Sequence, residues 1–310
     1  MGDPATRRQA LIALDCLLEV LGSDIEPYIP SLMDALVQLL DSAPLAIKGT
    51  VVGAIGSAAH ASKTKFAPYF PAVMERLVPC LQLTEEGEEL DLRGVCQDTV
   101  GTLAEAVGPE QFRPYYAPLM QHALQAIGVP NAPNLKECSY IFFAVVSRVY
   151  KEEFAAYLPA IMPILLAAIG QEEIDESTLL GESANPSDFA TGLDDDEDPD
   201  FEDVDEDIDS DDEEAMFKAS TAIAIEKECA GDALAEVFDH TGKAFLPYIE
   251  PSVKALMPGL KHHWHDGIRK SSVAALLGFI STLNRITNPP KWTKGSQSVS
   301  LSDSRALRDS

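Results

Sequence analysis

The sequence has 310 residues, of which 46% are hydrophobic and 24% charged, and its formal net charge is −27 at pH 7. A chain of this length folds as two globular domains or as one extended repeat array, and its apolar content suffices for a packed interior. The negative charge argues against direct binding of nucleic acid, because phosphates require a basic surface. The sequence contains neither a signal-like N-terminal stretch nor a long uninterrupted apolar run, so we expect no secretion and no association with a membrane.

Helices account for all the secondary structure that the sequence predicts. Apolar residues recur at helical spacing, as in Leu11, Leu14, Leu18 and Leu21, and no segment supports a strand. We assign the helices alternately to an outer and an inner layer, starting with an outer one. In chain order they are 6–22, 30–41, 44–60, 71–83, 88–107, 117–127, 132–150, 159–170, 217–240, 250–262 and 265–287.

A recurring turn joins each outer helix to the inner helix that follows it. In its fullest form, at residues 66–71, the turn reads Phe-Ala-Pro-Tyr-Phe-Pro. The first proline discourages the preceding helix from continuing, and the second suits the first turn of a new helix. The tyrosines are 41, 46, 42 and 91 residues apart, and an acidic segment supplies the excess in the last interval. They are Tyr28, Tyr69, Tyr115, Tyr157 and Tyr248.

This spacing predicts a helical repeat protein. A period of about 40–47 residues with two helices is typical of HEAT repeats, whereas tetratricopeptide and ankyrin repeats are shorter. Because one helix pair cannot bury its apolar face alone, successive pairs stack. The predicted fold is therefore all-α, a HEAT-repeat α-solenoid forming a right-handed superhelix of antiparallel helix pairs. Gly49, Gly53 and Gly56 lie inside a predicted helix and are expected to let neighbouring helices approach closely.

The predicted organisation has four segments. About four HEAT pairs occupy 1–171, an acidic loop that we expect to be disordered occupies 172–214, and HEAT repeats continue over 215–286. Residues 287–310 are predicted to be an inter-helix loop or a truncated tail.

The acidic loop carries most of the negative charge. It contains 22 Asp or Glu and no Lys or Arg, whereas the rest of the chain has 28 acidic and 23 basic residues. Two interpretations remain open: a solvated insertion that keeps a long solenoid soluble, or a polyanion that contacts Lys/Arg-rich partners or screens their groove. The residues that would do so are Asp194, Asp195, Asp196, Glu197, Asp198, Asp203, Asp205, Glu206, Asp207, Asp209, Asp211, Asp212, Glu213 and Glu214.

No pattern in the sequence indicates catalysis, a cofactor or a metal site. Phosphate-binding and nucleophile motifs do not occur, and Asp205, Asp207 and Asp209 lack the glycine and glutamate of a calcium loop. The histidines around Trp264 are better explained as a polar turn between helices than as ligands. Scattered cysteines without a Cys-x-x-Cys pair indicate reduced thiols. We therefore expect a protein that is not an enzyme.

The repeated Pro-Tyr-x-Pro turns, the helix over 92–108 and the acidic loop resemble the karyopherin-β (importin-β) family, and within it the importin-four-like receptors. The stretch Lys227–Val237, followed by Phe245-Leu-Pro-Tyr, adds to the resemblance, which covers residues 7–286. It implies that the chain is a fragment of a longer HEAT array.

The resemblance also implies a function. Such receptors bind nuclear localisation signals, pass FG nucleoporins and release cargo when Ran-GTP binds, so they shuttle between cytoplasm and nucleus. The implied partners are basic cargo proteins such as histones and ribosomal proteins, FG nucleoporins and Ran-GTP. A lysine-binding pocket on the concave face needs carboxylates and amides that point away from the core. The candidates are Asp34, Gln38, Glu75, Asp98, Gln121 and Gln125.

Two other functions remain open. The chain could be a HEAT scaffold or regulatory subunit that holds folded partners by surface complementarity, with a dispensable acidic loop. It could also be a chaperone for basic proteins, in which the loop alone shields their charge.

Overall fold

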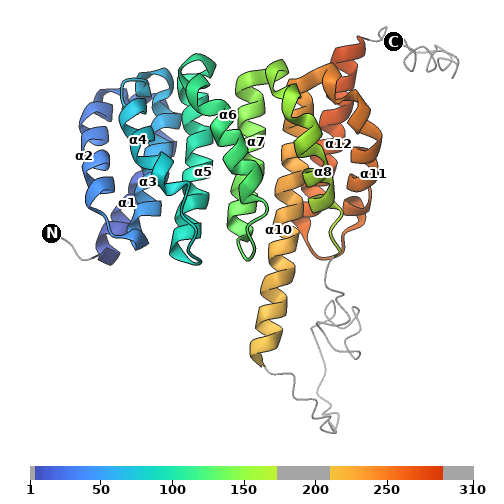
Figure 1. Ribbon diagram of the computed structural model, residues 1–310, viewed down its shortest axis with the longest axis horizontal. Coiled ribbons are helices and arrows are strands. Elements are labelled where there is room, and N and C mark those ends of the chain that lie inside the picture. The colour runs from blue at the N-terminus through green and yellow to red at the C-terminus, as the bar shows by residue number, and fades with distance from the viewer. Residues whose placement is uncertain (1–3, 173–209, 289–310) are drawn as a thin grey trace, which may run out of the picture.

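The computed structural model describes residues 4–172 and 210–288, and every regular element in these ranges is helical. The α-helices stand side by side from the N-terminal to the C-terminal end of the molecule (Figure 1). They are α1 (Pro4–Leu21), α2 (Ile29–Ser42), α3 (Leu45–Ser62), α4 (Phe70–Cys80), α5 (Glu88–Val107), α6 (Pro109–Ala126), α7 (Pro133–Tyr150), α8 (Leu158–Ile169), α10 (Ser210–Thr241), α11 (Ile249–Leu256) and α12 (Asp266–Thr287). Short 3₁₀ segments are η1 (Gly22–Tyr28), η2 (Lys63–Phe66), η3 (Lys151–Tyr157), η4 (Gly242–Tyr248) and η5 (Pro258–Lys261). The predicted stack of helix pairs is confirmed.

The helices form two layers that differ in how closely they pack. In one layer, α1, α3, α5, α7, α10 and α12 each pack lengthwise against the next. We call this the close-packed layer. Neighbouring helices of the other layer, α2, α4, α6, α8 and α11, touch each other little, and each rests instead on the close-packed layer. One continuous core lies between the layers and links the described repeats from Leu11 to Phe279.

The close spacing reverses the predicted assignment of layers. In a curved stack of two layers, the helices on the concave side are nearer to one another than those on the convex side. The close-packed layer, predicted to be outer, therefore lies on the inner side. Sequence periodicity could not show which layer is the inner one, because helices of both layers carry one apolar stripe. The spacing within a layer depends instead on the size of the side chains between neighbouring helices.

Small residues allow the close approach. The position of a Cβ on Gly56 of α3 would lie 3.4 Å from the Thr99 side chain of α5, and on Gly101 of α5 the same distance from Phe142 of α7. On Gly94 it would lie 3.0 Å from the Asn134 side chain. The predicted role in helix–helix approach is thus confirmed for Gly56. It is wrong for Gly53, where a Cβ would meet nothing within 4 Å.

The recurring turns bury their first aromatic or aliphatic residue. Ile25, Phe66, Phe154 and Phe245 are almost completely buried at the bends, whereas the tyrosine three residues later is partly or largely exposed. Four bends begin with a residue of positive φ: Gly22 (50°), Lys63 (48°), Lys151 (51°) and Gly242 (56°). Glycine adopts this conformation without strain and often ends a helix in this way.

The third copy of the turn differs from the prediction. The preceding helix stops at Gly108, whose φ is 81°, and Pro109 starts α6 at once. Phe112 and Pro114, predicted to lie in a bend before a helix at 117–127, are therefore inside α6. A Gly-Pro pair supplies both the stop and the start signal, so no separate bend is needed.

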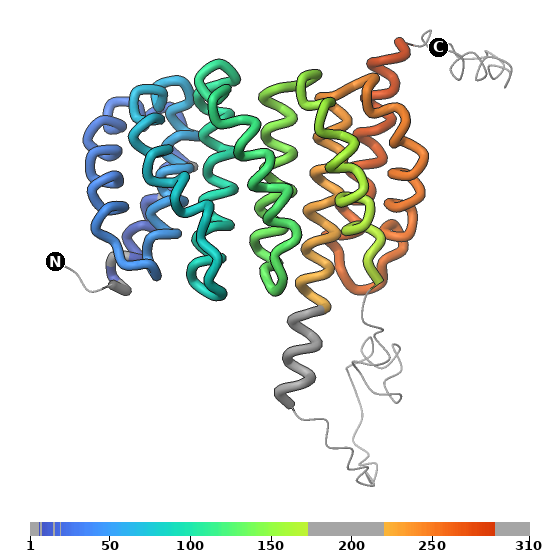
Figure 2. The backbone as a smooth tube through the Cα atoms, in the orientation of Figure 1, coloured from blue at the N-terminus to red at the C-terminus, as the bar shows by residue number. Residues whose placement is uncertain are grey.

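The acidic insertion lies inside a helix pair and not between pairs as predicted. It leaves α8 and returns at α10, and these two helices pack against each other. Across the close-packed layer, α10 is fastened to α7 by buried polar groups. The Tyr140 hydroxyl donates to Glu226 at 2.9 Å, and Lys136 lies 3.6 Å from the same carboxylate. Figure 2 shows α10 returning to the row beside α7.

The predicted segment boundaries are met only in part by the described residues. Helix α10 begins at Ser210, inside the predicted loop of 172–214, and acidic residues are favoured at a helix N-terminus. The residues from Asp194 to Asp209 in the predicted acidic set lie outside the described residues, as do 289–310.

Residues 133–169 are long and apolar enough to cross a membrane, by length and composition alone. They form two helices, α7 and α8, separated by the bend η3, and α7 packs between α5 and α10. This packing explains the apolar character of α7.

Candidate functional site

The solvent-facing stripe of the close-packed layer is the surface on which a partner could lie. On α5 the stripe runs through Asp91, Val95, Asp98, Thr102 and Glu105, which recur every three or four residues and are at least partly exposed. Corresponding stripes occur on α7 and α10. Because the rest of each helix is buried against its neighbours or against the other layer, only this stripe is accessible.

Three carboxylates lie in the middle of these stripes, one on each of three consecutive helices. They are Asp98 on α5, Glu137 on α7 and Asp232 on α10, and we call them the acidic patch. None of the three forms an ion pair or hydrogen bond with a side chain of the described residues 4–172 and 210–288. Asp98 and Glu137 are partly buried, whereas Asp232 is exposed. Because a partly buried carboxylate without a counter-charge is costly, the patch is a candidate site for external cations.

The carboxylates of the patch raise the pKa values of two nearby thiols. Burial raises the pKa of Cys138 on α7 to about 12, and the charges of Asp98 and Glu137 raise it further. Burial likewise raises the pKa of Cys229 on α10 to about 12, with contributions from Glu137, Glu228 and Asp232. Glu137 thus acts on both thiols, whereas Asp98 acts on Cys138 and Asp232 acts on Cys229.

Two of the carboxylates, Asp98 and Glu137, are destabilised in their charged form. Burial raises the pKa of Asp98, and burial together with the charge of Glu226 raises the pKa of Glu137. A raised pKa means that the charged form is destabilised in the folded protein, so the cost is present above that pKa and is relieved as the pH falls through it. A bound lysine or arginine would relieve it at neutral pH.

A groove of about 680 Å³ opens beside Asp98. Its wall on α3 includes Gly53, Ser57 and His60, and its wall on α5 includes Asp98 and Thr102. A Cβ on Gly53 would meet nothing within 4 Å, so the missing side chain leaves open space above α3.

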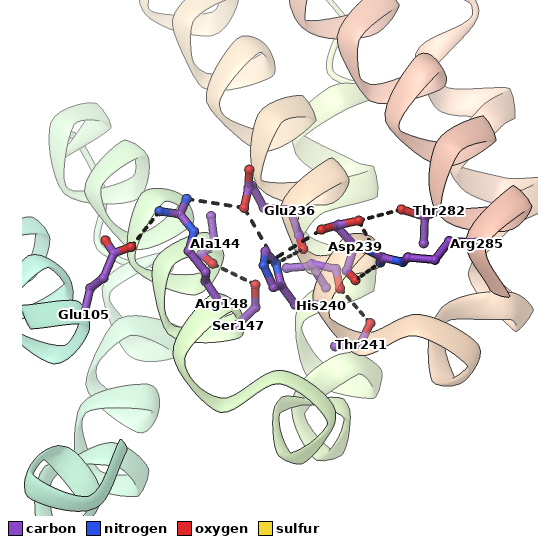
Figure 3. Close-up of polar contacts among 11 residues, drawn as sticks. Glu105, Ala144, Ser147, Arg148, Glu236, Asp239, His240, Thr241, Thr282 and Arg285 are labelled. Carbon is purple, nitrogen blue, oxygen red and sulfur yellow. Dashed lines mark hydrogen bonds and ion pairs between the residues drawn. The ribbon is translucent and has the colours of Figure 1, made fainter. Parts of the chain in front are cut away.

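Towards the C-terminal ends of the same helices the carboxylates are already paired. Arg148 on α7 contacts Glu105 on α5 at 3.1 Å and Glu236 on α10 at 3.3 Å. Farther along, Arg285 on α12 lies 2.8 Å from Asp239, which also accepts a hydrogen bond from Thr282 at 2.7 Å. Figure 3 shows these groups as one ladder across four helices. The close-packed layer therefore carries a neutralised row at this end and an uncompensated patch in the middle.

Only one of the six predicted cargo-binding residues lies on the close-packed layer. That residue is Asp98. Asp34, Gln38, Glu75, Gln121 and Gln125 are exposed on α2, α4 and α6 of the other layer, so the structure does not bring them together with Asp98. Whether any of the six contacts a partner remains a prediction.

Sequence reasoning missed Glu137 and Asp232. Both lie on helices that were assigned to the outer layer, and acidic residues at exposed helix positions are too common to stand out. The available signal was spacing: Asp98 is 39 residues before Glu137, about one repeat. Glu137 and Asp232 are not one repeat apart in the sequence, because the acidic insertion between α8 and α10 lengthens this interval.

The histidine-rich turn before α12 is accounted for by its own hydrogen bonds. His265 accepts from the backbone N–H of Ile268 at 3.3 Å and so caps α12, and His262 accepts from the N–H of His265 at 3.1 Å. Within the part of the chain that the structure describes, no three His, Cys, Asp or Glu residues are grouped in a way that could hold a metal ion.

The state of Asp98 leads to a prediction about stability. Asp98→Asn removes a half-buried charge and keeps the side-chain shape, so we expect the melting temperature at pH 7 to rise by roughly 2 °C. Calorimetry measures the change, and Asp34→Asn on an exposed helix face is the matched control. A lower melting temperature for Asp98→Asn would show that the carboxylate stabilises the fold.

A family model for importin subunit beta-1-like TPR repeats matches residues 5–142. The probable importin subunit beta-4 of Schizosaccharomyces pombe is 40% identical over 292 residues, which are 93% of this chain and 26% of that protein. Human importin-4 is 33% identical over 126 residues, or 41% of this chain and 12% of that protein. The chain thus spans about a quarter of the fission yeast relative.

Solved structures show the same fold. Kap121p bound to Pho4p matches with a TM-score of 0.67 and 21% identity, covering 91% of this chain and 26% of that one. Kap121p bound to Nup53p matches with a TM-score of 0.65 and 22% identity, over 91% and 25%. A Kap121p mutant in which three acidic residues are replaced by lysine matches with a TM-score of 0.66, 21% identity, and 91% and 26% coverage.

Proposed function

The chain belongs to the importin-β (karyopherin-β) family, as part of a HEAT-repeat array of the importin-4 type, and on this basis we propose that its acidic patch binds the basic segment of a cargo protein. One observation carries the proposal: three carboxylates on consecutive helices of the close-packed layer have no counter-charge among the described residues, while their neighbours Glu105, Glu236 and Asp239 do.

The chemistry of the patch favours an extended segment with several lysines or arginines. Asp98, Glu137 and Asp232 follow the direction in which the helices are stacked, so a chain laid across the helices would meet them in turn. Ile141 is 38% exposed on α7, the central helix of the three. An apolar contact there would supplement the charge pairs, each of which contributes only ~0.2–1 kcal/mol when exposed.

The full receptor would use this surface in transport. We propose histones and ribosomal proteins as cargo, FG nucleoporins as partners at the pore, release by Ran-GTP, and shuttling between cytoplasm and nucleus. The family membership supports these assignments, and the structurally similar Kap121p forms complexes with other proteins, namely Pho4p and Nup53p. The acidic residues between α8 and α10 add negative charge in the same repeat, which would raise the rate of encounter with basic cargo.

Binding of a lysine-rich peptide tests the proposal. We expect fluorescence anisotropy to show affinity that falls steeply with salt, because the Debye length decreases from ~10 Å at 0.1 M to ~3 Å at 1 M. A peptide of equal length with glutamine in place of lysine is the control and should not bind. Equal affinity for both peptides, insensitive to salt, would contradict the proposal and favour a scaffold for folded partners.

Removal of residues 173–209 separates the patch from the acidic insertion. With a flexible linker joining α8 to α10, we expect the peptide to bind more weakly but in the same salt-dependent manner. Complete loss of binding would assign recognition to the insertion alone, as in a chaperone for basic proteins.

A further inference from the structure

The guanidinium group of Arg148 bridges two carboxylates. Its two terminal nitrogens reach carboxylates on the helices to either side, Glu105 at 3.1 Å and Glu236 at 3.3 Å (Figure 3). The three side chains are 43%, 37% and 41% exposed, so the site is open to solvent. Figure 3 shows Arg148 lying between the two carboxylates, where it bridges α5 and α10 across its own helix.

This pair of carboxylates lies close to the acidic patch. Glu105 follows Asp98 by two helical turns on α5, about 10 Å along the helix, and Glu236 follows Asp232 by one turn on α10. All four face solvent from the close-packed layer. A basic segment that reaches the acidic patch therefore passes within side-chain length of Glu105 and Glu236.

We propose that Glu105 and Glu236 form a second cation subsite and that Arg148 is its internal occupant, which confines a basic partner to the acidic patch. The proposal rests on the proposed function and adds to it a residue that determines specificity. A lysine or arginine of the partner could enter the second subsite only by displacing Arg148 or after its removal.

Arg285, the other arginine of this row, is held by more contacts than Arg148. A basic side chain of a partner would therefore displace Arg148 more easily. Asp239 is bound by Thr282 at 2.7 Å as well as by Arg285, and Arg285 also donates to the Asp239 backbone carbonyl at 2.6 Å. Arg148 has only its two carboxylate contacts. The His240 side chain donates its Nδ1–H to the backbone carbonyl of Glu236 at 2.7 Å, and the same nitrogen lies 3.6 Å from the Glu236 carboxylate, which stays 41% exposed.

Arg148→Ala in the full chain tests the proposal. We expect about 3- to 10-fold tighter binding of an arginine-rich peptide near 0.1 M salt, because two exposed carboxylates become available to the peptide. Adding Glu105→Gln and Glu236→Gln to Arg148→Ala should return the affinity to that of the unmodified chain. Arg113→Ala is the control, since Arg113 on α6 of the other layer pairs with Glu153 in η3, and its removal should not affect binding.

The outcomes separate this inference from the proposed function. Unchanged or weaker binding by Arg148→Ala, with the acidic patch still required, would overturn the second subsite and leave the patch standing. An unmodified chain that binds no basic peptide would overturn the proposed function, whereas binding gained only in Arg148→Ala would still support the subsite. Melting curves check the fold of each variant.

Discussion

Replacing Asp98, Glu137 and Asp232 together with lysine is expected to weaken the binding of a lysine-rich peptide by at least about 30-fold. Three attractive contacts become three repulsive ones, and the loss per exposed pair is ~0.2–1 kcal/mol before repulsion is counted. Fluorescence anisotropy at low salt measures the change. The fold should be retained, because none of the three side chains has a partner among the described residues.

The matched control reverses the same number of charges on the other layer. Asp34 on α2, Glu75 on α4 and Glu250 on α11 are exposed, and their replacement by lysine gives the same net charge as the patch variant. We expect it to weaken binding by less than about 3-fold, through long-range charge alone. Two of these residues, Asp34 and Glu75, belong to the set predicted from the sequence. A larger loss in the control than in the patch variant would therefore move the binding surface to the other layer.

Phe245→Ala is expected to lower the free energy of unfolding by about 3–5 kcal/mol, the usual cost of emptying a large buried aromatic site. Phe245 is fully buried at the bend between α10 and α11. Its ring stacks on Phe238 with centroids 4.7 Å apart and meets Phe279 of α12 edge-on at 5.7 Å. One truncation thus loosens both helices of the close-packed layer at once. Urea denaturation followed by circular dichroism measures the loss.

Leu246 provides the control at the adjacent position. It is 40% exposed, so Leu246→Ala should cost less than about 1 kcal/mol. A Phe245→Ala variant that unfolds at the same urea concentration as Leu246→Ala would show that the bend does not depend on its buried aromatic residue. The stack would then be stabilised by contacts between helices alone.

The stacked helices could be predicted because the relevant information is local. Pro30, Pro71 and Pro159 lie in the first turns of α2, α4 and α8, where their fixed φ is favourable. The first aromatic or aliphatic residue of the turn is buried in each bend. The exception at Gly108-Pro109 is also local, and a glycine followed by proline was its visible signal. The bends at Lys63 and Lys151 had no such signal, since lysine rarely adopts positive φ.

The candidate site was predicted less well. Asp98 was chosen for its chemistry, and the structure places it in a patch with Glu137 and Asp232. The other five candidates were chosen on helices assigned to the inner layer, and those helices form the outer one. A carboxylate at an exposed helix position looks the same in the sequence whether a neighbouring helix supplies an arginine, as for Glu105, or supplies nothing, as for Asp98.

The sequence by itself determined the class of fold, the repeat length and the family, since periodicity, turn chemistry and charge runs are read along the chain. The tertiary structure alone decided which layer is concave, that the acidic insertion divides a helix pair, and which carboxylates lack a counter-charge. These three depend on distances between helices that are about 40 or more residues apart in the chain. Between α3, α5 and α7 such distances are set by small side chains at the helix contacts.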